Sequence, residues 1–159
     1  MSLRKFFFLT ALVVGLCIHS STAFAESPEK VAVKFAKAYY MLDASMEEYL
    51  CEACKTNEDE EKIVGLYLEK AGIKARNRGY AKSFLQMSIG DIDTEILNMN
   101  DSSAKVKITA VKTRNINPLY KVVGAVFNLI NEYEVDEIIN LVNKDGEWEI
   151  GPGAFDLPM

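Results

Sequence analysis

Apolar residues recur every three or four positions along the first part of the chain, from Val31 to Leu42. This is the spacing of one face of an amphipathic helix. Ser27 and Pro28 precede it, and they are typical of a helix start: serine caps the first turn, and proline loses no hydrogen bond there. The pattern predicts a helix over about 28–42.

Two shorter signals of the same kind follow. Ser45 and Glu48 have the spacing of a capping box, which predicts a second, shorter helix that carries the neighbouring cysteines. A third helix is expected to start at Asn57, with the acidic run 58–61 in its first turn, where negative charge suits the helix dipole. We expect Gly72 to end this helix in the left-handed conformation.

The period changes from helical to two in the second half of the chain. Residues 104–110 alternate between apolar and polar side chains, which predicts a half-buried strand with an antiparallel partner around 92–99. A second hairpin is predicted over 133–150, because an Asp-Gly pair supplies the positive dihedral angles of a tight turn. The apolar spacing over 117–131 favours a helix, while its β-branched residues leave a strand open.

The N-terminal residues have the layout of a cleaved secretory signal, with a short cationic start and an apolar run over 6–18. Small residues then precede a predicted cleavage between Ala25 and Glu26. A membrane anchor is disfavoured because the run is shorter than the roughly 20 residues of a spanning helix. A lipoprotein signal at Cys17 is disfavoured because Leu16 precedes it. We expect export, with retention in the periplasm or cell envelope favoured over full secretion.

Cleavage leaves one predicted domain, residues 26–159, which is long enough for a single core. The only histidine, His19, lies in the signal, so the mature chain is expected to lack imidazole for acid–base chemistry or metal binding. The formal net charge of the chain is −5, which disfavours nucleic acid as a partner. The sequence assigns no catalytic residue, no metal ligand and no cofactor, and we expect no transmembrane segment in the mature chain.

Cys51 and Cys54 form the most chemically specific motif of the chain. In an oxidising compartment this spacing favours a disulfide, and closing so short a loop contributes about 1–2 kcal/mol. Free or partner-linked thiols, a redox pair and a metal site remain alternatives. The redox alternative is disfavoured by the surrounding carboxylates of Glu47, Glu48 and Glu52, which destabilise a thiolate.

Two segments, VAVKFAKAYYMLDASMEEYL and INLVNKDGEWEIG, resemble the nuclear transport factor 2-like (cystatin-like) superfamily, in particular its small exported members of unassigned function. This resemblance implies an α+β fold in which N-terminal helices pack on a curved antiparallel sheet to form a cone-like half-barrel. The superfamily contains dehydratases, isomerases and cyclases besides binding and dimerisation modules, so the fold leaves the function open. No residue role is transferred from it.

On this basis we expect an exported, non-enzymatic binding module. Its partner would be a small apolar ligand in the cone, or an envelope protein or a second copy on the sheet face. An enzyme that uses tyrosine and a carboxylate in the cone is one alternative, and a thiol–disulfide protein acting through Cys51 and Cys54 is another. Aromatic and methionine side chains are the candidates for lining a pocket, with plain core packing as the alternative: Tyr39, Tyr40, Tyr67, Phe84, Met99 and Trp148.

Overall fold

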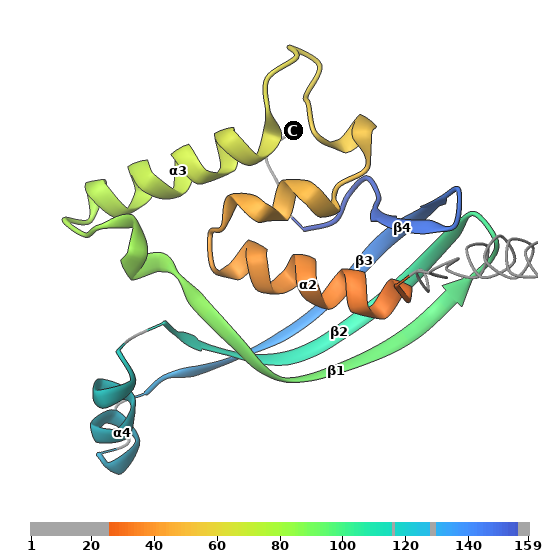
Figure 1. Cartoon of the computed structure of the whole chain (residues 1–159). Coiled ribbons are helices and arrows are strands. Elements are labelled where there is room, and N and C mark those ends of the chain that lie inside the picture. The colour runs from red at the N-terminus through yellow and green to blue at the C-terminus, as the bar shows by residue number, and fades with distance from the viewer. Residues whose placement is uncertain (1–25, 116, 128–129, 156–159) are drawn as a thin grey trace, which may run out of the picture.

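In the part of the chain that the structure describes, helices cover one face of a four-stranded antiparallel sheet, and a further helix projects beyond its end (Figure 1). The computed structural model describes residues 26–115, 117–127 and 130–155. The predicted signal peptide therefore lies outside the described residues. The strands follow one another in the sheet in the order in which they occur in the sequence, and their bounds are β1 Met87–Met99, β2 Ser103–Arg114, β3 Glu132–Lys144 and β4 Glu147–Ile150.

Helix α2 lies against the sheet and contacts all four strands, and α3 lies beyond it on the same side (Figure 1). The short helix η1 contacts both of them. Helix α4 connects β2 to β3 and projects beyond the end of the sheet, away from α2 and α3 (Figure 1). The helical elements are α2 Pro28–Tyr40, η1 Ala44–Tyr49, η2 Glu52–Cys54, α3 Ile63–Asn77, η3 Lys82–Leu85 and α4 Pro118–Val126.

The core forms where alternate residues of β2 and β3 meet the apolar face of α2. Val106 and Ile108 of β2 and Ile139 of β3 are fully buried, as is Phe35 of α2. Burial of a side chain of this size contributes about 1.5–3 kcal/mol each. Because these side chains occupy the space between α2 and the sheet, the region beneath the helix is filled rather than hollow.

These observations confirm the predicted fold class, α+β with N-terminal helices on a curved antiparallel sheet. The first helix and both hairpins are also confirmed, and the strands extend further than the periodicity indicated. Asp145 and Gly146 have φ angles of 55° and 93°, as the predicted tight turn requires. The helix favoured over 117–131 is observed as α4.

The predicted starts of the second and third helices are wrong. Asp43, not Ser45, caps η1: its carboxylate accepts a hydrogen bond from the Ser45 backbone N–H at 2.9 Å. That helix ends at Tyr49, before the cysteines. Asn57 starts a turn rather than a helix, because its side-chain oxygen accepts the backbone N–H groups of Asp59 and Glu61. The acidic run therefore lies in a loop, and compensation of a helix dipole does not explain it.

The predicted end of the third helix at Gly72 is also wrong. Gly72 is buried inside α3, which continues to Asn77. Gly79 takes the left-handed position instead, with φ 76°. Its N–H donates to the Arg76 carbonyl, and the Tyr80 N–H donates to the Ala75 carbonyl. This is the Schellman arrangement, and it moves the end of the helix seven residues on.

Candidate functional site

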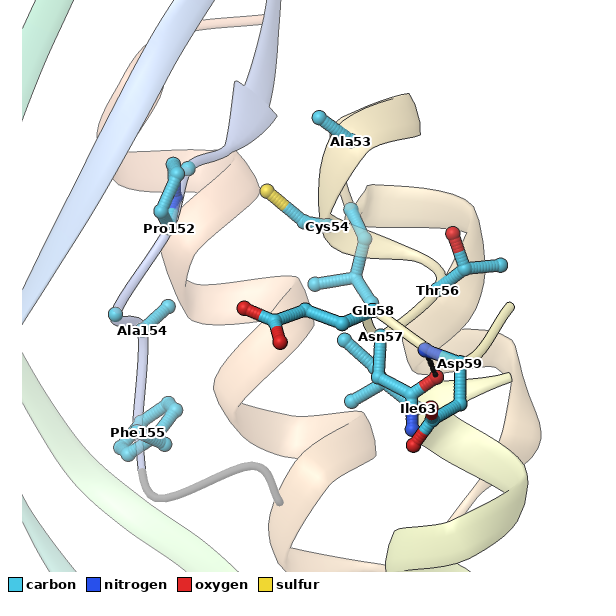
Figure 2. Close-up of a pocket in the computed structure, with 13 residues that line it drawn as sticks. Ala53, Cys54, Thr56, Asn57, Glu58, Asp59, Ile63, Pro152, Ala154 and Phe155 are labelled. Carbon is cyan, nitrogen blue, oxygen red and sulfur yellow. Dashed lines mark hydrogen bonds between the residues drawn. The ribbon is translucent and has the colours of Figure 1, made fainter. Parts of the chain in front are cut away.

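An open cleft of about 920 Å³ lies between the loop that precedes α3 and the segment that follows β4 (Figure 2). One wall comes from residues 50–63 and the other from residues 151–155, so segments from opposite ends of the chain build it together. The lining residues are Leu50, Ala53, Cys54, Thr56, Asn57, Glu58, Asp59, Ile63, Gly151, Pro152, Gly153, Ala154 and Phe155.

Backbone hydrogen bonds shape the first wall. The Asn57 side-chain oxygen accepts the N–H groups of Asp59 at 3.0 Å and Glu61 at 2.8 Å, and the Asn57 N–H donates to the Glu61 carbonyl. The first of these bonds is drawn in Figure 2. The loop is thereby tied into a compact turn, and Figure 2 shows the side chain of Glu58 reaching from it across the cleft towards the opposite wall.

The second wall is held against β3. The Gly151 N–H donates to the Asn140 carbonyl at 2.8 Å, and the Asn140 side-chain amide donates to the Pro152 carbonyl at 3.4 Å. A Cβ atom at Gly151 would lie 3.2 Å from the Asn140 carbonyl oxygen, so glycine permits this close approach. The segment is positioned by the sheet rather than by the loop opposite.

A disulfide joins Cys51 and Cys54 at the edge of the cleft, with the sulfur atoms 2.03 Å apart. Cys51 is buried, and its N–H donates to the Ile150 carbonyl at 2.9 Å. Leu50 also forms a parallel bridge with Ile150. Since Cys54 lines the cleft, the disulfide connects the cleft wall to the end of β4.

An aromatic cluster lies directly behind the second wall. Tyr39 of α2 stacks on Phe155, with ring centroids 4.4 Å apart, and on Tyr67 of α3, at 4.8 Å. Tyr40 meets Tyr39 edge-on at 5.3 Å, and Phe35 stacks on Phe155 at 5.5 Å. Phe155 therefore takes part in both the cleft and the cluster.

Burial changes the acidity of two of these tyrosines. It raises the pKa of Tyr40 to about 12, with a smaller contribution from the negative charge of Glu137. The pKa of Tyr67 is raised further, first by burial and then by a hydrogen bond with Tyr39. The Lys112 ammonium lies 5.0 Å from the centre of the Tyr40 ring, within cation–π range. Both hydroxyls remain protonated at neutral pH and are unsuited to act as bases.

Three of the six residues proposed from the sequence to line a pocket lie together: Tyr39, Tyr40 and Tyr67. None of them is among the residues that line the cleft, and they lie behind its wall. Phe84 lies apart, stacked on Tyr80 at 4.1 Å with the Arg114 guanidinium 3.8 Å above its ring.

Two further candidates lie elsewhere on the sheet. Met99 is 52 % exposed at the end of β1, and Trp148 on β4 packs on the core.

The sequence interpretation did not include Phe155 or Glu58 as site residues. The signal for Phe155 is its position directly after Gly151-Pro152-Gly153-Ala154. These four residues have small side chains and no helix or strand pattern, so a bulky aromatic residue stands out after them. Glu58 belonged to an acidic run that the helix prediction had already explained. Because α3 starts at Ile63, six residues after the expected start at Asn57, Glu58 lies in the loop and its carboxylate can face the cleft.

Acid–base and metal chemistry have few candidate residues here. Within the described ranges no polar or charged residue is buried as a whole, although one oxygen of the half-buried Glu29 carboxylate is buried without a hydrogen-bond partner. Glu137, the carboxylate that influences Tyr40, is exposed. In the same part of the chain no three cysteine or carboxylate side chains lie close enough together to hold a metal ion.

No helix in residues 26–115, 117–127 and 130–155 is both long enough and apolar enough to cross a membrane.

Among the comparisons with known proteins, the matches are to solved structures. No protein-family model matches the chain, and no curated protein matches it. Among solved structures, a crystal structure from Campylobacter jejuni described as a "putative NTF2-like transpeptidase" is 22% identical in sequence, with a TM-score of 0.46. The match covers 79% of this chain and 98% of that chain. The assignment of the α+β fold class therefore depends on this chain's own strand order and helix packing.

Proposed function

We propose that this protein is an exported, non-enzymatic binding module that holds a small ligand with an apolar surface in the cleft between residues 50–63 and 151–155. The single observation that carries the proposal is the cleft of about 920 Å³ with its mixed lining. Pockets for small molecules lie in the range of about 300–1,000 Å³ and combine apolar walls with a few polar groups.

The lining supplies both kinds of contact. Pro152 is exposed and Phe155 half-buried on one wall, and Ala53 is exposed on the other, so apolar surface is accessible from both sides. Glu58 and Thr56 can bond to a polar group of the ligand. This position differs from the one expected from the resemblance to nuclear transport factor 2-like proteins, because the space beneath α2 is filled by core residues and the cleft lies beside it.

Export is part of the proposal. The disulfide between Cys51 and Cys54 persists in oxidising compartments such as the bacterial periplasm, which supports the envelope location expected from the N-terminal signal. Cleavage between Ala25 and Glu26 remains a proposal, together with the single domain over 26–159.

A ligand-binding role is favoured over the other partner expected from the sequence, a protein or second copy on the open sheet face. That face carries polar residues and an ion pair, with the Lys107 ammonium 3.0 Å from the Asp136 carboxylate. A thiol–disulfide role is less favoured because only one of the two sulfur atoms is accessible to an attacking thiolate: Cys51 is 8% exposed, while Cys54 is half-buried and lines the cleft.

The experiment is a titration of the protein with Nile red, an uncharged apolar dye, combined with native mass spectrometry of protein purified from its own source. Ala53→Trp places a bulky ring in the cleft at an exposed position, and Ala81→Trp makes the same change at an exposed position outside it. We expect Ala53→Trp to remove saturable dye binding and any retained ligand mass, and Ala81→Trp to leave both unchanged. Dye binding and retained mass that are equal in the two variants would refute the proposal.

A further inference from the structure

The largest group of exposed apolar side chains in the described residues lies on α4 and the residue after it. Val122, Val126 and Phe127 are 65%, 75% and 68% exposed. Tyr120 and Val123 are exposed as well. We call these five residues the α4 patch. Exposed apolar surface gathered in one place marks a contact with another molecule or with a membrane, whereas scattered residues need no explanation.

The patch occupies one side of the helix. At 100° per residue, positions 122, 123, 126 and 127 fall within an arc of about 140°, the width typical of an apolar helix face. On the other side, Gly124 is buried against Ile130: a Cβ atom at Gly124 would lie 2.9 Å from a carbon of that side chain. The helix is therefore packed against its own connection on one side and open on the other.

The position of α4 decides which partner fits. Figure 1 shows the helix at the tip of the β2–β3 hairpin, beyond the end of the sheet and away from the helical layer. Such a projecting apolar element can reach a flat surface without interference from the rest of the domain. Its surface is small: five side chains expose on the order of 500 Å², below the roughly 800 Å² that each partner of a stable dimer buries.

Charges of both signs lie around the α4 patch, with one more basic than acidic residue. Three basic residues, Lys112 and Arg114 on the strand that leads into the helix and Lys121 in α4 itself, stand against Glu132 and Glu134 on the strand that leads out of it. A highly charged partner would gain little from this arrangement. Shallow insertion of apolar side chains into a bilayer depends on buried apolar area and does not require net charge.

We propose that the α4 patch is a membrane-contact element that inserts its apolar side chains into the interfacial region of a phospholipid bilayer and holds the domain at the surface. This is independent of the ligand-binding function proposed for the cleft. The apolar side chains of the α4 patch do not select a particular lipid headgroup. Neutral and anionic bilayers should therefore bind the protein about equally.

The experiment is co-sedimentation of the protein with vesicles of phosphatidylcholine, and with vesicles of phosphatidylcholine mixed with phosphatidylglycerol, at low and high salt. Val126→Asp should lower the partition coefficient between vesicles and water at least tenfold, because a charged side chain replaces an apolar one that would be buried in the bilayer. Leu97→Asp is the matched control: Leu97 is 45% exposed near the end of β1, at the other end of the sheet, and its change should alter binding less than twofold.

Three results would overturn the inference. The first is a failure of the unaltered protein to sediment with either vesicle. The second is a loss of binding that is equal for Val126→Asp and Leu97→Asp. The third is a concentration-dependent dimer in analytical ultracentrifugation that Val126→Asp dissociates, which would mean that a second copy covers the patch. The emission of Trp148, which lies on β4, verifies that each variant is folded.

Discussion

Phe155 offers the sharpest test of how the two ends of the chain are held together. Its ring contacts Tyr39 at 4.4 Å, Phe35 at 5.5 Å and Tyr40 at 5.7 Å, measured between ring centroids. Phe155→Ala removes all three contacts and leaves a gap behind the cleft wall. The backbone at this residue is left-handed, with φ 52°, and alanine relieves none of that strain.

The magnitude follows from the contacts and the burial. Each aromatic pair contributes about 0.5–1.5 kcal/mol, and these values overlap with the transfer free energy of a half-buried ring, about 1.5 kcal/mol. We therefore expect Phe155→Ala to lower the free energy of unfolding by about 2–4 kcal/mol. Urea denaturation followed by the emission of Trp148, the only tryptophan, measures this change.

The matched control is Phe127→Ala, because Phe127 is 68% exposed on the α4 patch. Its change in unfolding free energy should stay within about 0.5 kcal/mol. The reasoning fails if the two variants lose the same stability with an unchanged urea dependence. In that case the C-terminal segment would contribute nothing to the fold, and the cleft would lack a fixed second wall.

Three further outcomes are expected. Cys51→Ser with Cys54→Ser should lower the free energy of unfolding by about 1–2 kcal/mol and leave the protein folded; a protein without a cooperative urea transition would contradict this. Gly79→Ala should cost about 1 kcal/mol in the same assay because φ is 76°, whereas Gly90→Ala, where an added Cβ meets nothing within 4 Å, should cost less. Because the pKa of Tyr40 is raised to about 12, its stabilising contribution is complete below pH 10 and is lost as the pH rises towards 12. Tyr40→Phe should flatten the fall in melting temperature over that range, and an unchanged slope would contradict the assignment.

Most of the fold could be predicted because its elements obey local periodicity. The alternation around Val106 and Ile108 places those residues on the buried face of the sheet. The β3–β4 hairpin keeps one register throughout, whereas β1 shifts its register against β2 after Gly90 and again after Ile96. The helix start at Pro28 was predicted from its immediate neighbours, although the Ser27 side chain forms no capping hydrogen bond with the helix. In each case the residues that determine the element lie within a few positions of it.

The segment between α2 and α3 could not be predicted in the same way, because several residues compete for the same role. Asp43, Ser45 and Asn57 can each accept a backbone N–H group, and capping rules do not rank them. What decides the outcome is distant in sequence: Cys51 bonds to Ile150, at the end of β4. A local rule has no access to that contact, so the positions of η1, η2 and the acidic loop were missed.

The candidate site shows the same limit more strongly. Tyr39 and Tyr67 were identified as aromatic residues on helices, but the residue that joins them to the cleft, Phe155, follows them by more than 80 positions. Sequence spacing cannot show such a contact. The small residues before Phe155 indicate an irregular segment, but only the close approach of Gly151 to Asn140 shows that the segment returns to the sheet.

The arrangement of Phe155 links ligand binding to stability in a way that follows from its two contacts. The same ring closes the aromatic cluster on one side and lines the cleft on the other. A ligand that requires the wall in its observed position binds only the folded arrangement, so its binding stabilises that arrangement by mass action, by about 2.7 kcal/mol at 100 times its dissociation constant. Occupation of the cleft should therefore raise the melting temperature of the unaltered protein, and Phe155→Ala should weaken the ligand's affinity because part of its binding free energy must first order the segment.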